Sequence, residues 1–201
     1  QESARGTEFE SFNGIRPDHQ TILPFTRLMG GPMDYTPGIF EGDLSVYGSN
    51  KAKLGTTLVK QLALYVTMYS PLQMAADLYQ NYEKYPDAFQ FIKDVAVDWD
   101  HTYILEAEPG DYITIARKAK GKNEWYVGGI TDENSREALI DFSFLPKGKK
   151  YQAVIYADGE KADWRTNPKE YVIETRTVSH KTKLRQKLAP SGGVAISIKE
   201  L

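Results

Sequence analysis

The sequence of 201 residues contains no cysteine, which excludes disulfide bonds and thiolate metal sites. No run of apolar residues is long enough to cross a bilayer, and no signal peptide is visible. Excess charge of one sign is also lacking, because the formal net charge is -2. A nearly neutral chain gives no electrostatic reason to expect nucleic acid as a partner. The chain starts at Gln1 rather than Met, so we expect a processed product or a piece of a longer protein.

The patterns that are present change near Trp99. Before it, apolar residues recur at intervals of three and four, which predicts a helix whose apolar face holds Leu54, Leu58, Leu62, Tyr65, Val66 and Tyr69. Lys60 and Gln61 should lie near the other side of this helix. Ser70 is a good N-cap and Pro71 suits the first helical position, so a second helix is predicted to begin there. The stretch YPDAFQFIKDV predicts a third, short helix.

After Trp99 the apolar period becomes two, which is typical of β-strands. We predict strands in DYITIARK, EWYVGGIT, ALIDFSF, YQAVIYAD, EYVIETRTV, LRQKL and VAISIKEL. Turn sequences such as EPGD and LPKGKK separate them. This pattern predicts an antiparallel β-sandwich domain over residues 99–201, with a core that includes Ile113, Ile115, Val127, Ile130, Ile140, Phe142, Val154 and Ile155.

The stretch LPFTRLMGGPMDYTPG, residues 23–38, is apolar but broken by proline and glycine. We predict a helix in TILPFTRLM capped by Asp18, then an extended segment in GPMDYTPG. A buried Asp34 would need a partner, and Arg27 is the nearest candidate. An extended segment followed by a long amphipathic helix is a βα unit. Residues 1–98 are therefore predicted to be α/β, the C-terminal end of a (β/α)8 TIM barrel whose front is missing.

Several motifs agree in order with a known family. ESARGTE, DHQTILPFTRLMGGPMDYTPG, KQLALYVTMYSPLQMAADL and the stretch from FIKDVAVDWDHTYILEAEPGDY to GGITDEN together resemble glycoside hydrolase family 97. The resemblance implies an N-terminal β-sandwich, a central barrel and a C-terminal β domain, of which this chain holds the barrel end and the last domain. It also implies a calcium-dependent, periplasmic or secreted hydrolase that cleaves the α-glucosidic bonds of starch-derived oligosaccharides. The family's α-glucosidases are most similar, which favours inversion.

The candidate site residues come from the same resemblance. Glu8 matches the family's general acid, and Glu2 and Glu8 match residues at its calcium site. Carboxyl groups suit both roles, because glycosidases need an acid and calcium prefers oxygen ligands. The remaining ligands and the catalytic bases lie upstream in the family. His19, at the expected start of a helix, could donate a hydrogen bond to a sugar hydroxyl or serve only local packing. His101 and His180 are predicted to be surface residues.

Two alternatives stay open. The family also contains retaining α-galactosidases, and the residues that separate the two mechanisms lie upstream of Gln1. The β domain could instead be a non-catalytic support or a glycan-binding module. Aromatic faces stack on sugars, but Trp125 and Tyr126 are better explained by packing within a strand. Trp164, in the polar loop EKADWRTNPKEY, is the strongest candidate for an exception.

Overall fold

The computed structural model describes residues 16–48 and 51–201. Its helical elements precede the sheet, apart from the 3-10 turn η4 (Phe142–Phe144): α1 (His19–Ile22), η1 (Leu23–Phe25), η2 (Arg27–Gly30), η3 (Leu44–Tyr47), α2 (Leu58–Thr67), α3 (Tyr79–Tyr82) and α4 (Pro86–Asp94). The strands follow: β1 (Trp99–Glu108), β2 (Tyr112–Ala119), β3 (Glu124–Thr131), β4 (Arg136–Asp141), β5 (Tyr151–Asp158), β6 (Tyr171–Val178), β7 (Lys183–Leu188) and β8 (Gly193–Glu200). None of these helices is both long and apolar enough to span a membrane.

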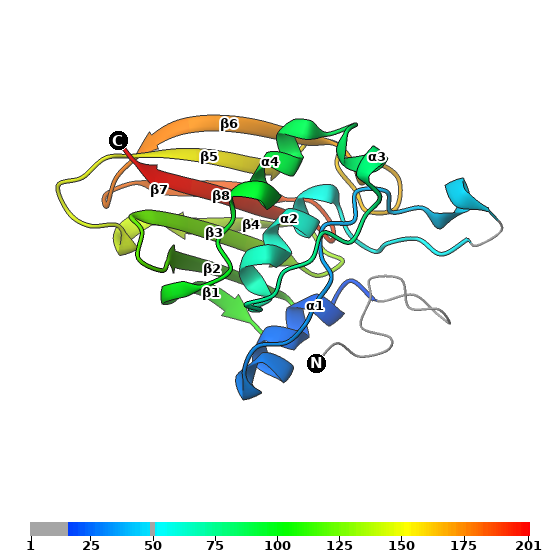
Figure 1. Ribbon diagram of the computed structural model, residues 1–201, viewed down its shortest axis with the longest axis horizontal. Helices are drawn as coiled ribbons and strands as arrows, with labels where there is room; N and C mark the ends of the chain where they lie inside the picture. Colours follow the sequence, from blue (N-terminus) through cyan, green and yellow to red (C-terminus); the bar gives the residue numbers. More distant parts are fainter. Residues whose placement is uncertain (1–15, 49–50) are drawn as a thin grey trace.

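The β region is antiparallel, as predicted. Six strands form one sheet in the order β1-β2-β3-β8-β5-β6, and β4 and β7 form a separate two-stranded ribbon. All seven strands expected from alternation are present, although ALIDFSF ends in the 3-10 turn η4. Strand β1, an edge strand whose residues are mostly exposed, is not among the strands predicted from the sequence. Figure 1 shows the helices over one face of the six-stranded sheet.

Both faces of the large sheet are buried. On the helix side, one core cluster joins residues of α2 and α4 to Ile113, Ile115 and Ile130 of the sheet. On the ribbon side, a second cluster contains Val127, Ile140, Phe142 and Ile155. Seven of the eight predicted core residues are thus buried, whereas Val154 is half-buried against the helix-side core. The two predicted parts therefore share a core, and whether either folds alone stays a prediction.

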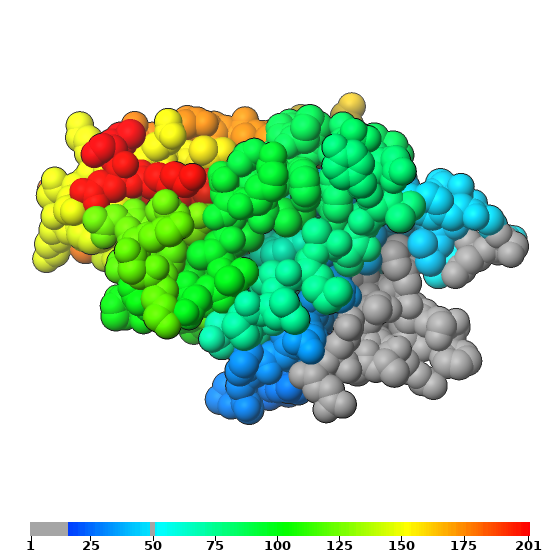
Figure 2. Space-filling model, viewed as in Figure 1, coloured from blue at the N-terminus to red at the C-terminus, as the bar shows by residue number. Residues whose placement is uncertain are grey.

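Helix α2 confirms the periodicity of its sequence but not the predicted exposure. All ten of its residues are buried, including Lys60 and Gln61. The Thr57 side chain caps its first turn by accepting a hydrogen bond from the Lys60 N–H. Figure 2 shows why the outer side is covered, because the segment around α3 and α4 lies across it. Two glycines allow α2 to approach the sheet. A Cβ on Gly128 would lie 2.6 Å from the Ala63 carbonyl oxygen, and one on Gly193 would lie 2.9 Å from the Lys60 Cα.

Two other helix predictions are wrong. Residues 70–78 form no helix, because the Ser70 hydroxyl closes a local turn with the N–H and C=O groups of Leu72. Residues 21–29 break into short turns around Pro24 rather than one helix. Asp18 makes no side-chain cap there, since its carboxylate accepts hydrogen bonds from Arg16 at 2.6 and 3.1 Å. The third prediction is confirmed by α4, which has Pro86 in its first turn.

The extended segment at residues 32–42 is held by side chains. The Gln61 Oε1 atom accepts hydrogen bonds from the Gly38 and Ile39 N–H groups, and the Asp77 carboxylate accepts from those of Phe40 and Glu41. In the described part of the chain this segment pairs with no strand. The barrel end therefore stays a prediction.

The predicted ion pair between Asp34 and Arg27 is wrong. The Arg27 guanidinium points at the carbonyl oxygens of Gly31 and Pro32, each at 3.4 Å. Asp34 itself is half-buried. Since Arg27 is exposed, its charge keeps access to water and does not require a carboxylate partner.

Candidate functional site

The predicted acid and calcium residues, Glu2 and Glu8, lie outside the described residues. Within residues 16–48 and 51–201, no group of three or more His, Asp and Glu side chains could hold a metal ion. The calcium prediction therefore rests on Glu2 and Glu8 alone. His19 is described and is the first residue of α1.

His19 lies at the surface. The residue is exposed, yet nearby protein atoms partly desolvate the imidazole and lower its pKa from 6.5, against the opposing charge of Asp18. The ring stays accessible to solvent, since desolvation of one side of the imidazole leaves the other side open. A neutral imidazole can both donate and accept a hydrogen bond, as contact with a sugar hydroxyl requires. No described residue shows that His19 binds a sugar, so this role stays a prediction.

A buried cation anchors the backbone beside His19. The Lys60 side chain is fully buried in the first turn of α2. Its Nζ donates hydrogen bonds to the Pro17 carbonyl at 2.9 Å, the Thr131 carbonyl at 2.8 Å and the Ser191 hydroxyl at 3.1 Å. These three acceptors belong to the N-terminal segment, the end of β3 and the loop before β8. Lys60 thus fixes the segment that carries His19 to one end of the sheet.

A buried carboxylate lies in the same region. The Asp158 Oδ2 atom, at the end of β5, accepts hydrogen bonds from the Ala189 N–H at 2.9 Å and the Gly193 N–H at 2.8 Å. Burial raises the pKa of Asp158 to about 6, although a hydrogen bond from the Thr57 hydroxyl, these two N–H groups and the charge of Lys60 oppose the shift. Asp158 holds the loop before β8 against β5. We assign it a structural role, because it is only 7% exposed.

A surface hollow of about 390 Å³ lies between two loops at this end of the sheet. One loop joins the extended segment to α2, and the other joins β5 to β6 (Figure 1). The Lys169 ammonium and the Glu41 carboxylate form an ion pair across it at 2.6 Å. We call this feature the loop hollow; its lining includes Glu41, Asp43, Lys53, Trp164, Arg165, Asn167 and Lys169.

The walls of the loop hollow are polar and are held by local hydrogen bonds. The Asp163 Oδ1 atom accepts hydrogen bonds from the Arg165 and Thr166 N–H groups, which fixes the turn that carries Trp164. The Arg165 guanidinium stacks over the Trp164 indole, 4.3 Å from the ring centroid. On the opposite wall, hydrogen bonds from Ser45 and Lys53 lower the pKa of Asp43 to about 2, so it is ionised near neutral pH. An aromatic face beside fixed charges and amides can bind a polar ligand such as a saccharide.

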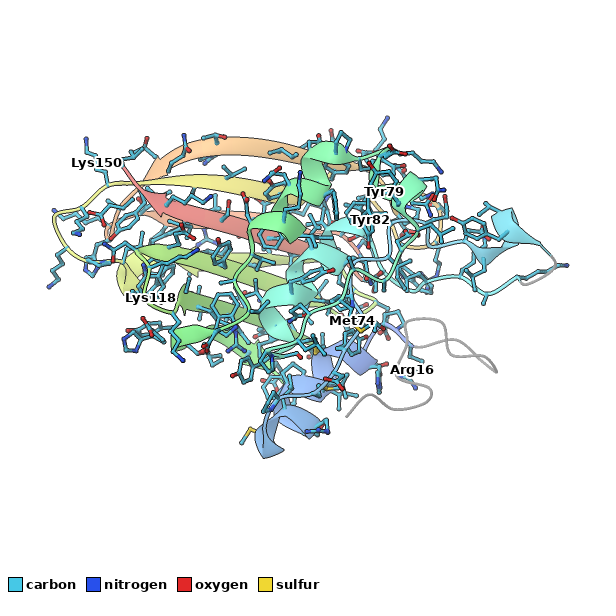
Figure 3. The ribbon with its side chains drawn as sticks, in the orientation of Figure 1. Arg16, Met74, Tyr79, Tyr82, Lys118 and Lys150 are labelled. Atoms are coloured by element: carbon cyan, nitrogen blue, oxygen red, sulfur yellow. The ribbon has the colours of Figure 1, made fainter. Side chains whose placement is uncertain are left out.

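The other predictions for aromatic and histidine residues are confirmed in part. Trp125 and Tyr126 are buried in the two cores, so the packing explanation is confirmed for both. His101 is exposed, as predicted, whereas His180 is half-buried with its Nδ1 2.9 Å from the Leu145 carbonyl oxygen. Trp164 is half-buried at the loop hollow. Figure 3 shows Lys118 and Lys150 toward one end of the molecule, Arg16 toward the other end and Met74 between them.

Comparisons with known proteins define the class as glycoside hydrolases. Residues 98–199 match the family model described as "Glycosyl-hydrolase 97 C-terminal, oligomerisation". A retaining alpha-galactosidase of Bacteroides thetaiotaomicron is 38% identical over 206 residues, which cover 95% of this chain and 30% of that protein. The chain belongs to glycoside hydrolase family 97. It spans less than a third of the length of this relative.

Solved structures agree with this assignment. A family 97 enzyme from Pseudoalteromonas sp. strain K8, solved in complex with acarbose, is 49% identical and superposes with a TM-score of 0.89 over 94% of this chain and 29% of that one. A variant of the same enzyme was solved with panose. Both ligands are bound by that enzyme. The relatives do not agree on one substrate, since one is a retaining alpha-galactosidase and the 49% identical enzyme was solved with acarbose, so the expected similarity to the α-glucosidases stays a prediction.

Proposed function

We propose that this chain is the C-terminal part of a retaining α-galactosidase of family 97. The observation that carries the proposal is the alignment of 95% of the chain with a retaining alpha-galactosidase at 38% identity. A second relative, a probable retaining alpha-galactosidase of Streptomyces bingchenggensis, is 33% identical over 111 residues, which cover 55% of this chain and 16% of that protein. Hydrolysis of an α-glucoside is the second candidate, because the 49% identical enzyme was solved with acarbose and panose.

The test uses the longer protein that carries this chain. We expect it to release p-nitrophenol faster from the α-galactoside than from the α-glucoside. Proton NMR of the first sugar released should show the α-anomer, since a retaining enzyme passes through a covalent intermediate. Faster cleavage of the glucoside with β-anomer release would instead favour the second candidate. Activity on neither substrate would count against both.

Within that proposal, Glu8 donates the proton to the departing sugar oxygen. This role is the same in retaining and inverting enzymes, so it does not depend on the stereochemical outcome. Glu8→Gln should slow substrates with poor leaving groups by about 10²-fold or more. A glycosyl fluoride should be slowed much less, because its leaving group needs little protonation. Equal slowing of both substrate types would show that Glu8 is not the acid.

We also propose that Glu2 and Glu8 contribute to a calcium site and that the longer protein is periplasmic or secreted. Two carboxylates supply too few oxygen atoms for the six to eight that calcium takes, so the chain alone should bind the ion weakly. Calorimetric titration should detect tight binding only in the longer protein. Glu2→Gln should weaken it and slow all substrates alike. Tight binding by the chain alone would contradict this ligand set.

A further proposed role is contact between the loop hollow and the substrate chain. The observation that favours it is the fixed turn that holds Trp164 opposite Asp43 and Lys53. Trp164→Ala should weaken binding of an α-linked trisaccharide, measured by calorimetry. Tyr103→Ala removes an exposed aromatic residue on β1 and is the matched control. Equal affinities for both variants would exclude the loop hollow. Finally, following the family description, we propose that residues 98–199 mediate oligomerisation.

A further inference from the structure

The two edges of the six-stranded sheet differ in regularity. At one edge, β1 shifts register twice against β2, between Trp99 and His101 and between Ile104 and Glu106. Such bulges disrupt an edge and hinder pairing with another chain. At the other edge, β6 pairs with β5 through eight consecutive residues without a shift. Among the described strands, none pairs with the outer side of β6.

Strand β6 also lacks the usual protection of an edge. Residues 172–177 are all exposed, and they include Val172 at 54% and Ile173 at 37%. The strand contains no proline or lysine, and its only charged residues are Glu174 and Arg176. Natural proteins usually cover, shorten or charge such an edge. A regular, exposed strand with apolar side chains is suited to pair with another strand. Figure 1 shows β6 along one border of the molecule.

We propose that β6 pairs antiparallel with β6 of a second copy of this chain, with Thr175 on the two-fold axis. This inference rests on the proposed oligomerisation role and assigns it a surface and a register. Two identical antiparallel strands related by a two-fold axis form an isologous contact, in which each residue before the axis meets the equivalent residue after it. The joined sheet would run without interruption through both copies.

The charges of the strand select this register. In an antiparallel pair, residues directly opposite each other have their side chains on the same face of the sheet, and a two-fold axis normal to the sheet keeps each side chain on its own face. The axis must therefore pass beside a residue of β6 and not between two residues. The register is defined by which residue this is. With Glu174 on the axis two carboxylates would face each other, and with Arg176 there two guanidinium groups would. With Thr175 on the axis, Glu174 of each copy faces Arg176 of the other. Like charges directly opposite are destabilising and opposite charges are favourable.

The neighbouring pairs fit the same register. Glu174 is opposite Ile155 of β5, which lies in the ribbon-side core, so Glu174 and Arg176 share the ribbon side of the sheet. In one copy these two side chains already pair at 2.5 Å and are each 51% exposed. Pairing across the axis therefore redirects an existing pair without burying an isolated charge. Val172, which is 54% exposed, would face the buried Val178 of the second copy, so part of the apolar surface of Val172 would leave water.

Disulfide trapping can determine directly which residue of β6 lies on the two-fold axis. The chain has no cysteine, so one introduced thiol is unambiguous. On the axis, the two Cα atoms of Thr175→Cys would lie about 4.5–5.5 Å apart, within disulfide range. Thiols at Glu174→Cys or Arg176→Cys would be separated by about 8 Å, which is too far. We expect an oxidised dimer at Thr175→Cys only, whereas Thr102→Cys on the exposed β1 edge is the control and should stay monomeric on a non-reducing gel.

Charge reversal tests the same contact in solution. In sedimentation experiments on the 201-residue chain, Glu174→Arg and Arg176→Glu should each raise the dimer dissociation constant by about tenfold, and the double swap should restore it. Circular dichroism checks that each variant folds. One outcome overturns the β6 contact but leaves the oligomerisation role intact. In that outcome the dimer persists in both charge-reversal variants, and no disulfide-linked dimer forms with cysteine at position 174, 175 or 176. A chain that stays monomeric throughout overturns both.

Discussion

Replacing Asp158 with Asn should change how the stability of this fold depends on pH. Burial raises the pKa of Asp158 from 3.8 to about 6, so the folded chain holds this proton more tightly than the unfolded chain does. The stabilisation from the protonated group is therefore complete below about 3.8 and is lost as the pH rises through 6. At 1.36 kcal/mol per pH unit, this interval corresponds to up to about 3 kcal/mol.

The variant isolates this effect. Asparagine does not titrate, but its side-chain oxygen can still accept hydrogen bonds from the Ala189 and Gly193 N–H groups. Urea denaturation of both proteins between pH 4 and 7 gives the free energy of unfolding at each pH. The value for Asp158→Asn minus that for the wild type should increase with pH by up to about 3 kcal/mol.

A control carboxylate should behave in the opposite way. Asp100 is exposed, and hydrogen bonds from the Gly121 N–H and the Lys118 ammonium lower its pKa. Its contribution is present at neutral pH and is lost as the pH falls, so for Asp100→Asn the same difference should decrease as the pH rises. A difference for Asp158→Asn that is flat or falls with pH would refute the assignment of a raised pKa to this residue.

Three further predictions concern packing, capping and activity. Gly128→Ala places a Cβ 2.6 Å from the Ala63 carbonyl oxygen and should lower the free energy of unfolding by about 1–3 kcal/mol. Gly30→Ala is the control, because its Cβ meets nothing within 4 Å. Equal melting temperatures for the two variants would contradict the close approach of α2 to the sheet. Thr57→Ala removes the cap of α2 and should cost about 1 kcal/mol in urea denaturation, while a change of a few tenths would mean that the cap is dispensable. The isolated chain should hydrolyse neither p-nitrophenyl α-galactoside nor the α-glucoside, and measurable turnover would show that no upstream group is needed.

Local pattern was sufficient for the seven strands β2 to β8, whose β-branched and aromatic residues are separated by turn sequences. Alternation predicted β2 to β8 because each of them faces a core on at least one side for part of its length. It failed for β1, which begins with the mostly polar residues WDHT and shows no alternation of burial.

Contacts between distant residues explain the wrong helix over residues 70–78. Ser70 and Pro71 form a good start signal, but the backbone that follows is held by other segments. The Tyr65 hydroxyl donates to the Met74 carbonyl at 2.7 Å, and the Ala76 N–H donates to the Pro37 carbonyl at 3.2 Å. These partners satisfy groups that a helix would have paired internally. Such contacts with distant segments cannot be predicted from the local sequence pattern.

Contacts between distant residues also explain why the positions of Lys60 and Gln61 could not be predicted from the sequence. Polar residues in an apolar helix normally predict an exposed side, so Lys60 and Gln61 were placed near the surface of α2. Both are buried because their acceptors and donors come from elsewhere: Lys60 binds the Pro17, Thr131 and Ser191 oxygens, and Gln61 binds the N–H groups of the extended segment. A buried ammonium is tolerated only with such partners. Helix α2 therefore fixes both the segment next to His19 and the segment that leads to the loop hollow against the β domain. Under the proposed function, the β domain therefore sets the position of the segments that approach the substrate.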